Sequence, residues 1–353
     1  MQIAIQQWLS LMVFSLKLVN HSTMTVVSKP KLLVVELWGI GDLAIATPFL
    51  RAAAERYQVT LLAKPHALEL QARLWPEVRV EPWTAPWTVF RGKYQLWRWP
   101  WRSMSALFRK LRAEKFDVAV SARSDPRDHP VMKFATAESR LGFPIGGSGI
   151  FLNQPLAAPE QSAHRYEYWR IVAAKLRLAL PERQRLPVMD HHDRRLVLVH
   201  SGARLAARVW PMPYYHDLVS RLRQEGHTVQ VLCDPNQEAQ WRQWDENQVS
   251  CPRSLEQLFF WLDRAAAFVG NCSGPGHLAA VSGVPTFTFF GPSRSVWFAP
   301  LHPQADWLED NSCSYKPCKD YCHFSSPRCL ENITVESAWL PVRHFLQRSG
   351  VAT

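Results

Sequence analysis

The sequence predicts an α/β protein in which two doubly wound domains face each other across a cleft. Three observations lead to this prediction. The chain has 353 residues, which is enough for two domains that each bury a core. Short apolar runs rich in β-branched residues alternate with helical segments, a pattern typical of parallel sheets with helices on both faces. The alternation stops in a polar, proline-containing stretch near residue 190 and then begins again.

The first half opens with the apolar run KLLVVEL at 31–37, which predicts a strand. A glycine-containing loop follows, and then a helical spacing of apolar residues from Leu43 to Ala54. The run VTLLAK at 59–64 predicts a second strand. FDVAVSA at 116–122 predicts another strand, after the helical segment SALFRKLRAEK at 105–115.

The second half repeats this organisation. Its helices are predicted at 214–226, where Gly226 is a C-terminal cap, and at 255–265. Its predicted strands are, in order, 196–203, 227–234, 266–271 and 284–292. We therefore expect two Rossmann-like domains, residues 31–190 and 191–353, with a hinge near residue 190.

Residues 1–30 form an N-terminal extension before the first predicted strand. Its apolar run WLSLMVFSLKLV at 8–19 contains Lys17 and is shorter than the roughly 18 apolar residues that a spanning helix needs. A basic leader and a small-residue cleavage site are lacking, which disfavours a secretory signal. Three interpretations stay open: an upstream extension before a true start at Met24, an interfacial amphipathic helix, or a signal-like segment. We expect a cytoplasmic protein.

The charge balance favours anionic partners. Lys and Arg outnumber Asp and Glu by 41 to 30, and the chain holds 16 tryptophans. Positive charge alone does not choose among nucleic acid, phosphorylated small molecules and an acidic membrane surface. Tryptophan is enriched at membrane interfaces and at stacking sites that keep one edge wet.

The stretch VGNCSGPGHLAAVSGVP at 269–285 is the most glycine-rich part of the second half. A strand ends there and a helix begins, so backbone N–H groups near Ser273 and Gly274 point out of the carboxyl edge of the sheet. Open α/β sheets bind ligands at that edge, and a helix N-terminus attracts phosphate. His277 adds a hydrogen-bonding group. The alternative is a plain turn with a capping histidine.

The stretch GIGDLAIATP at 39–48 has the same logic in the first half. Gly39 and Gly41 allow a tight loop that a ligand can approach closely. Asp42 is either the acidic cap of the next helix or a carboxylate that points into the cleft as general base. The glycine spacing does not match a dinucleotide fingerprint, which disfavours an NAD enzyme.

A third stretch, HSGARLAARVWP at 200–211, follows the strand that opens the second half. Its Ser201–Gly202 turn brings Arg204 and Arg208 to the carboxyl edge of the sheet. Guanidinium groups offer forks of donors that suit pyrophosphate oxygens. Solvated arginines are the alternative for either one alone, but two in one such loop favour anion binding.

In order and spacing, these three stretches resemble the motifs of glycosyltransferase family nine, the lipopolysaccharide heptosyltransferase family. The resemblance covers roughly residues 31–345. It implies the glycosyltransferase-B (GT-B) fold, with the acceptor on the N-terminal domain and a nucleotide sugar on the C-terminal domain. It also implies an inverting, metal-independent transfer that requires no cofactor, with ADP-heptose as the default donor.

The resemblance also assigns roles to single residues. Asp42 corresponds to the proposed catalytic base, and Gly39 and Gly41 line the acceptor side. The donor side comprises Ser201, Gly202, Arg204, Arg208, Glu238, Cys272, Ser273, Gly274 and His277. Cys272 replaces the usual aspartate, which is thought to contact the donor sugar. Because a thiol bonds weakly and is mostly uncharged near pH 7, the resemblance implies a phosphate cradle but leaves recognition of heptose open.

The segment 82–113 holds five tryptophans and seven Lys or Arg residues without an acidic residue. This mixture suits an anionic bilayer surface, sugar rings beside phosphates, or single-stranded nucleic acid. Because the family's acceptor is a lipid-linked glycan, we favour acceptor and membrane contact, with Trp97 and Trp99 as acceptor residues, over simple packing and over nucleic acid. Asp125 and Arg127 resemble an acceptor-side pair in relatives.

Four cysteines, Cys313, Cys318, Cys322 and Cys329, lie within seventeen residues. Their spacings do not form paired C-x-x-C knuckles, so they signal a structural zinc site only weakly, and disulfides are disfavoured in a reducing cytoplasm. Similar segments in the family imply a structural role.

The function that these features predict is glycosyl transfer to a lipopolysaccharide-type glycan by a peripheral protein at the inner face of the plasma membrane. Two other classes stay open. One is a non-catalytic relative that binds a nucleotide or glycan, which Cys272 favours, and the other is a sugar-nucleotide epimerase on the same fold. We expect no nucleic-acid partner.

Overall fold

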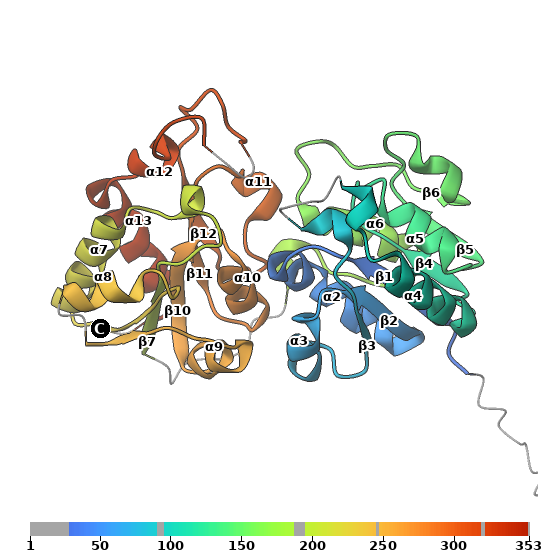
Figure 1. Ribbon diagram of the computed structural model, residues 1–353. Coiled ribbons are helices and arrows are strands. Elements are labelled where there is room, and N and C mark those ends of the chain that lie inside the picture. Colours follow the sequence, from blue (N-terminus) through green and yellow to red (C-terminus); the bar gives the residue numbers. More distant parts are fainter. Residues whose placement is uncertain (1–27, 90–94, 187–194, 245–246, 319–321, 352–353) are drawn as a thin grey trace, which may run out of the picture.

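The structure is a computed structural model that describes residues 28–89, 95–186, 195–244, 247–318 and 322–351. It contains two six-stranded, fully parallel sheets, one in each half of the chain, flanked by helices (Figure 1). This confirms the predicted fold class of two doubly wound α/β lobes. The division at 190/191 lies outside the described residues and stays a prediction, as do the three interpretations of residues 1–27.

The first sheet has the order β3-β2-β1-β4-β5-β6. Its strands are β1 (Lys31–Glu36), β2 (Gln58–Ala63), β3 (Arg79–Pro82), β4 (Val118–Val120), β5 (Ser139–Gly142) and β6 (Gln154–Pro155). Alternate residues of β1 enter two different cores. Val34 packs with α2 (Ile40–Arg56), α3 (Ala67–Leu74) and α6 (Arg165–Lys175), whereas Val35 packs with α4 (Trp101–Glu114) and α5 (Asp128–Phe134). Burial on both faces explains why this strand is an unbroken apolar run.

The second sheet repeats the arrangement with the order β12-β11-β10-β7-β8-β9. Its strands are β7 (Leu196–His200), β8 (Thr228–Leu232), β9 (Val249–Ser250), β10 (Ala265–Asn271), β11 (Thr286–Phe290) and β12 (Asp306–Glu309). Its helices are α7 (Met212–Gln224), α8 (Glu238–Gln243), α9 (Leu255–Leu262), α10 (Gly274–Val281), α11 (Ser295–Phe298), α12 (Arg328–Glu331) and α13 (Val335–Arg348). One face packs against α9 and α10, and the other against α7 and α13.

The long central strands lie where the sequence predicts them, and Gly226 has the left-handed backbone expected of a helix cap, with φ of 92°. The predicted strand 116–122 is shorter, Val118–Val120, and 196–203 ends at His200. The short strands β3, β5, β6, β9 and β12 were not predicted, because two to four residues give no periodic signal.

The inner helices of the two lobes meet in one shared core. Leu43 of α2 and Leu278 of α10 belong to the same cluster of buried apolar side chains, and so does Phe259 of α9. The guanidinium of Arg73, on α3, lies 4.6 Å from the ring centre of Phe259 and pairs with Asp263. The two lobes therefore pack directly against each other at α2–α10 and α3–α9.

The N-termini of α2 and α10 lie close together between the lobes. A Cβ added to Gly274 would lie 3.2 Å from the Cβ of Ile40, and one added to Gly41 would lie 2.9 Å from the Cδ2 of His277. Both glycines are needed for backbone to approach across the interface. Within the part of the chain that the structure describes, no helix is both long and apolar enough to cross a bilayer.

Replacing Gly41 by alanine tests this interface. The added methyl group would have to displace the buried ring of His277, so we expect the free energy of unfolding to fall by about 1–3 kcal/mol in urea titrations. Gly39→Ala is the matched control, because its methyl group would meet only Asp42 Oδ2 at an ordinary 3.5 Å. Equal stability of the two variants would contradict the close approach.

Candidate active site

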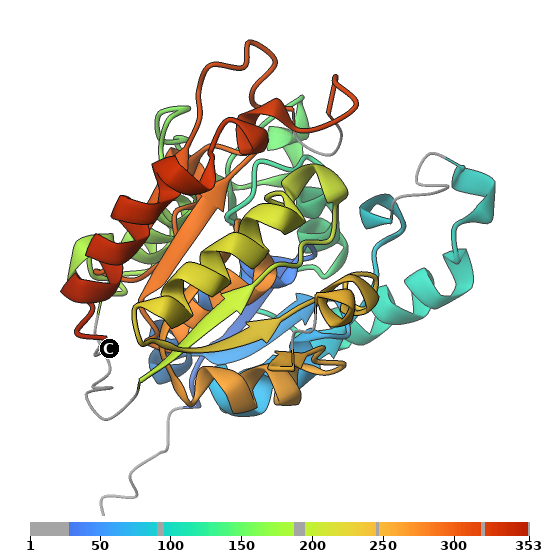
Figure 2. The same ribbon diagram turned by 90° about the vertical axis from the view of Figure 1, so that its left-hand side faces the viewer.

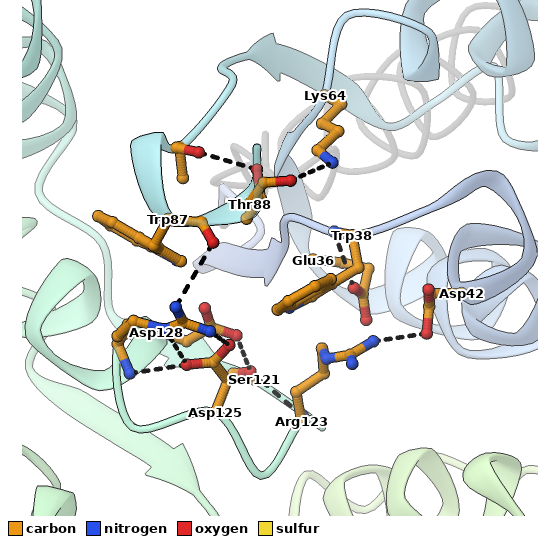
Figure 3. A network of polar contacts seen from close by, with 12 residues as sticks. Glu36, Trp38, Asp42, Lys64, Trp87, Thr88, Ser121, Arg123, Asp125 and Asp128 are labelled. Carbon is orange, nitrogen blue, oxygen red and sulfur yellow. Dashed lines mark hydrogen bonds and ion pairs between the residues drawn. The ribbon is translucent and has the colours of Figure 1, made fainter. Parts of the chain in front are cut away.

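Asp42 lies in the first turn of α2, directly after the carboxyl end of β1. Its Oδ2 accepts the backbone N–H of Gly39 at 3.1 Å, and its Oδ1 accepts Arg123 Nη1 at 2.5 Å. Figure 3 shows the carboxylate turned toward Arg123. Asp42 therefore caps α2, which is one of the two roles predicted from the sequence, and its role as general base stays a prediction.

Charges from several elements act on Asp42. Burial by itself would raise the pKa of Asp42, but the guanidinium groups of Arg123 and Arg165 outweigh it and hold the pKa below its ordinary value. The side chain remains 23% exposed. Asp42 is therefore ionised at neutral pH and accessible, as a proton acceptor must be.

Glu36 is a second carboxyl group close to Asp42. It is the last residue of β1, is almost fully buried, and accepts the backbone N–H of Trp38 at 3.4 Å. Burial, reinforced by the negative charge of Asp42, raises the pKa of Glu36 to about 7. The two neighbouring carboxyl groups are thus pushed apart in proton affinity, a pattern that is frequent in active sites.

Cations line the same side of the cleft. Arg123 lies 4.5 Å from the ring centre of Trp38, and Arg165 donates to the carbonyl of Ala122 at 3.2 Å. Lys64, directly after β2, donates to the carbonyl of Thr88 at 3.4 Å, and burial lowers its pKa (Figure 3). The sequence analysis did not single out these three cations, although Lys64 and Arg123 both follow parallel strands, where ligand-binding residues are expected.

Asp125 and Arg127, the predicted acceptor-side pair, form an ion pair, and their role toward an acceptor stays a prediction. Arg127 donates to both carboxylate oxygens of Asp125 at 2.8 Å and also to the carbonyl of Trp87 at 3.4 Å. The next residue, Asp128, is fully buried and accepts from Ser121, and burial raises its pKa well above the ordinary value. Asp125 thus lies in the same polar network as Arg123, and its negative charge adds to those that raise the pKa of Arg123 (Figure 3).

On the opposite lobe, the N-terminus of α10 faces Asp42. Ser273 is its N-cap residue, and His277 lies in its first turn against Gly41. Among the described residues, the buried Ser273 Oγ and His277 Nδ1 find no hydrogen-bond partner. Burial lowers the pKa of His277 to about 4, so the ring is neutral near pH 7. These groups are free to bind a ligand at a helix N-terminus.

Asn271 fixes the position of this helix relative to the loop 200–211. Its Oδ1 accepts the backbone N–H of Trp210 at 2.8 Å, and its Nδ2 donates to the carbonyls of Ser201 and Gly202 at 2.9 and 3.2 Å. The hydroxyl of Ser201 is fully buried between Gln237 and Trp241. Ser201 therefore positions the loop instead of offering its side chain to a ligand.

The two arginines of this loop lie close enough to residues of the site to change their pKa values. Arg208 affects the pKa values of both Cys272 and His277, and Arg204 affects that of Lys64 on the other lobe. Cys272 is buried and accepts a hydrogen bond from Ser293 at 3.5 Å. Burial raises the pKa of the Cys272 thiol, so it carries no charge where the family's motif has an aspartate.

Two carboxylates lie at the end of β8. Glu238, in the first turn of α8, pairs with Arg242 at 2.9 Å and Arg253 at 3.1 Å. Asp234, which the sequence analysis did not single out, packs on Gly202, where an added Cβ would lie 2.4 Å from its Cγ. Asp234 therefore lies against the loop that carries Arg204, a contact that was not predicted from the sequence.

The remaining predicted residues lie elsewhere. Trp97 is 76% exposed, and Trp99 stacks between Trp87 and Trp101 with ring centres 5.7 and 5.4 Å apart. The four clustered cysteines are free thiols. Among the described residues, no three His, Cys, Asp or Glu side chains converge to hold a metal ion, so the structure gives no support to the weakly signalled zinc site.

Comparison with known proteins places this geometry in a family. The sequence profile of glycosyltransferase family 9 (heptosyltransferase) matches residues 104–325, more than half of the chain. The chain belongs to glycosyltransferase family 9. The resemblance inferred from the three glycine-rich and basic stretches is thereby confirmed.

Individual relatives of this family 9 protein match over parts of their length. Lipopolysaccharide heptosyltransferase 3 of Escherichia coli K12 is 26% identical over 33% of this chain and 35% of its own length. Lipopolysaccharide heptosyltransferase 1 of Pseudomonas aeruginosa is 28% identical over 39% and 43%. The aligned parts thus span less than half of these curated relatives. The solved structure of E. coli heptosyltransferase WaaC with ADP is 17% identical, with a TM-score of 0.68 over 90% of this chain and 99% of that one, and shows the shared GT-B fold.

The protonation of Glu36 is testable through stability. Its pKa rises from 4.5 to about 7 on folding, so the folded protein binds this proton more tightly than the unfolded chain. Stability that this group contributes at low pH is therefore lost as pH rises from 4.5 to 7. Between pH 4.5 and pH 7, the free energy of unfolding of Glu36→Gln should therefore rise by about 3 kcal/mol relative to that of wild type, as measured by urea unfolding.

The exposed glutamate Glu55 of α2 supplies the control. Glu55→Gln should keep a constant offset from wild type across the same pH range. If Glu36→Gln kept a constant offset as well, Glu36 would not hold its proton as described.

Proposed function

We propose that the protein is an inverting glycosyltransferase that moves a sugar from a nucleotide-diphosphate donor to a lipopolysaccharide-type glycan. The observation that carries the proposal is the placement of an ionised carboxylate, Asp42, opposite the N-terminus of α10 at the contact between the lobes. Membership of family 9 supports the reaction class. The acceptor is assigned to the lobe of residues 31–190 and the donor to the lobe of residues 191–353.

In this mechanism the acceptor hydroxyl attacks the anomeric carbon while its proton passes to Asp42. The new C–O bond forms on one face of the sugar as the bond to the diphosphate breaks on the other, which inverts the configuration. Arg208 and the N-terminus of α10 stabilise the negative charge that develops on the departing nucleotide diphosphate. Neutral His277 and Ser273 donate hydrogen bonds to its oxygens.

The donor proposed by default is ADP-heptose. A family 9 structure of similar fold, E. coli WaaC, contains ADP, and the carboxylate of Glu238 suits the ribose hydroxyls. Arg204, Arg208 and the helix N-terminus supply the positive charge, so we propose a metal-independent transfer without a cofactor. Cys272 offers the sugar only a neutral, weakly bonding thiol, which favours a donor sugar that needs no carboxylate at this position.

The acceptor side of the site carries a cluster of cations. Lys64, Arg123 and Arg165 converge near Asp42, and Arg127 lies behind them. Such a cluster suits an acceptor that bears carboxylate or phosphate groups. A lipid-linked acceptor would be reached at the inner face of the plasma membrane, so we propose a cytoplasmic, peripheral protein. Gly39 and Gly41 let the acceptor approach the start of α2.

The role of Asp42 is tested by Asp42→Asn in a transfer assay with ADP-heptose and an extracted lipopolysaccharide acceptor. Losing the base should lower turnover by about 10²- to 10⁴-fold, while ADP binding measured by calorimetry stays close to wild type. Unchanged turnover would refute the role of Asp42.

The same assay separates the alternatives. A non-catalytic binding protein, the alternative that Cys272 favours, would bind nucleotide without releasing ADP in the presence of acceptor. An epimerase would convert the nucleotide sugar without any acceptor.

The ion pair with Arg123 predicts a change in pH dependence. Because Arg123 holds the pKa of Asp42 low, Arg123→Gln should raise that pKa and move the acidic limb of the kcat/KM profile to higher pH. Arg127→Gln is the matched control, since the ion pair of Arg127 is with Asp125. A profile that moves equally in both variants would contradict the specific role of Arg123.

A further inference from the structure

The first lobe carries an extension that the transfer chemistry does not use. We call it the arm and define it as residues 83–89 and 95–113, which include the one-turn helices Pro86–Thr88 and Leu96–Arg98 and most of α4. Figure 2 shows this part of the chain projecting beyond both lobes. A projecting element exposes side chains that the cores do not need.

A ladder of indole rings gives the arm its shape. The ring centres of Trp83 and Trp87 are 5.3 Å apart, those of Trp87 and Trp99 are 5.7 Å apart, and those of Trp99 and Trp101 are 5.4 Å apart. The indole N–H of Trp101 donates to the carbonyl of Leu96 at 2.9 Å. Helix α4 buries Met104, Leu107 and Leu111 against the lobe. These contacts join the described residues of the arm to one another and to the lobe, and such preorganisation lowers the entropy lost on binding.

The far end of the arm exposes large apolar side chains to solvent. Trp97 is 76% exposed, and Leu96 and Trp101 are each 53% exposed. Isolated exposed apolar residues are ordinary, but three within six residues of one projecting turn form a patch that marks an interaction site.

Positive charge surrounds this patch. Arg98, Arg102, Arg109 and Arg112 are exposed, and the sequence from 82 to 113 contains no acidic residue. Lys110 of the arm pairs with Glu81 at 2.5 Å. The arm thus joins exposed indole rings to guanidinium groups on the same short segment.

We propose that the arm docks on an anionic lipid bilayer, with Trp97, Trp101 and Leu96 in the headgroup region and the arginines on lipid phosphates. Indole rings prefer this interface because they have an apolar body and a polar N–H. Basic side chains beside them add attraction to anionic lipids. The aliphatic Leu96 favours the acyl boundary over nucleobases, which bind by stacking on aromatic faces.

The base of the arm is joined to the acceptor side of the cleft. The carbonyl of Trp87 accepts from Arg127, and the carbonyl of Thr88 accepts from Lys64 (Figure 3). Docking would therefore hold the cation cluster close to the membrane surface. This consequence rests on the proposed function, since only a lipid-linked acceptor makes such proximity useful, whereas the docking itself does not depend on it.

Co-sedimentation of the full chain with vesicles tests the proposal. The wild-type protein should bind vesicles of phosphatidylcholine mixed with phosphatidylglycerol. It should bind vesicles of phosphatidylcholine alone much more weakly. Trp97→Ala/Trp101→Ala should weaken the partition into mixed vesicles by about tenfold or more, because both rings lose their interfacial contact. Arg98→Gln/Arg102→Gln should also weaken binding to mixed vesicles, and the loss should be larger at low salt than at high salt.

Two control variants complete the experiment. Phe260→Ala removes another exposed aromatic ring, 49% exposed, from α9 on the other lobe and should bind like wild type. Circular dichroism spectra should show that all variants are folded. The proposal is overturned if the wild-type protein binds neither kind of vesicle, or if the tryptophan variant binds like wild type. It is also overturned if the arm residues are needed for binding an oligonucleotide or a free glycan but not for binding lipid.

Failure of this proposal is distinguishable from failure of the proposed function. Asp42→Asn should bind mixed vesicles like wild type although it transfers sugar slowly. Vesicle binding by a wild-type protein that transfers no sugar would leave the arm assignment standing and remove the transferase assignment. Transfer without vesicle binding would do the opposite.

Discussion

The contact between the N-termini of α2 and α10 is the constraint on which the site depends. The side chain of His277 lies against Gly41, and that of Ile40 lies against Gly274, so each helix end packs one side chain on a glycine of the other. Each helix starts at the carboxyl edge of its own parallel sheet. The same contact joins the inner cores of both lobes into one cluster, so the stability of the lobe interface and the geometry of the site have a common origin.

Nearby charges and burial give the titratable groups at this contact different protonation states. Asp42 and Glu36 are neighbouring carboxyl groups, but Asp42 is partly exposed and pairs with Arg123, whereas Glu36 is almost fully buried and accepts a long backbone hydrogen bond from Trp38. One group is therefore ionised and the other holds its proton near neutral pH. On the other lobe, burial keeps His277 neutral and Cys272 protonated. The positive charge at this end of the second lobe thus comes from arginines and from the helix end.

The arm extends this arrangement beyond the cleft. It shares two backbone carbonyls with the cations of the acceptor side, so its orientation is tied to that of Lys64 and Arg127. Its rings are held by one another, and its charges are left to solvent. An enzyme that takes a soluble donor and a lipid-linked acceptor would need both a closed cleft and a surface that stays at the bilayer, and these two requirements fall on different parts of one lobe.

The two sheets could be predicted from the sequence, because strands that are buried on both faces are apolar runs. The turns at Asp42 and Ser273 could also be predicted, because glycines between a strand and a helix allow a tight turn that another group can approach closely. The arm could be located from its composition. Only the tertiary structure brought Glu36, Lys64, Arg123 and Arg165 around Asp42, and placed Asn271 between two loops. Those residues come from separate segments of the chain, and pairing between charges depends on distances in space that no local spacing records.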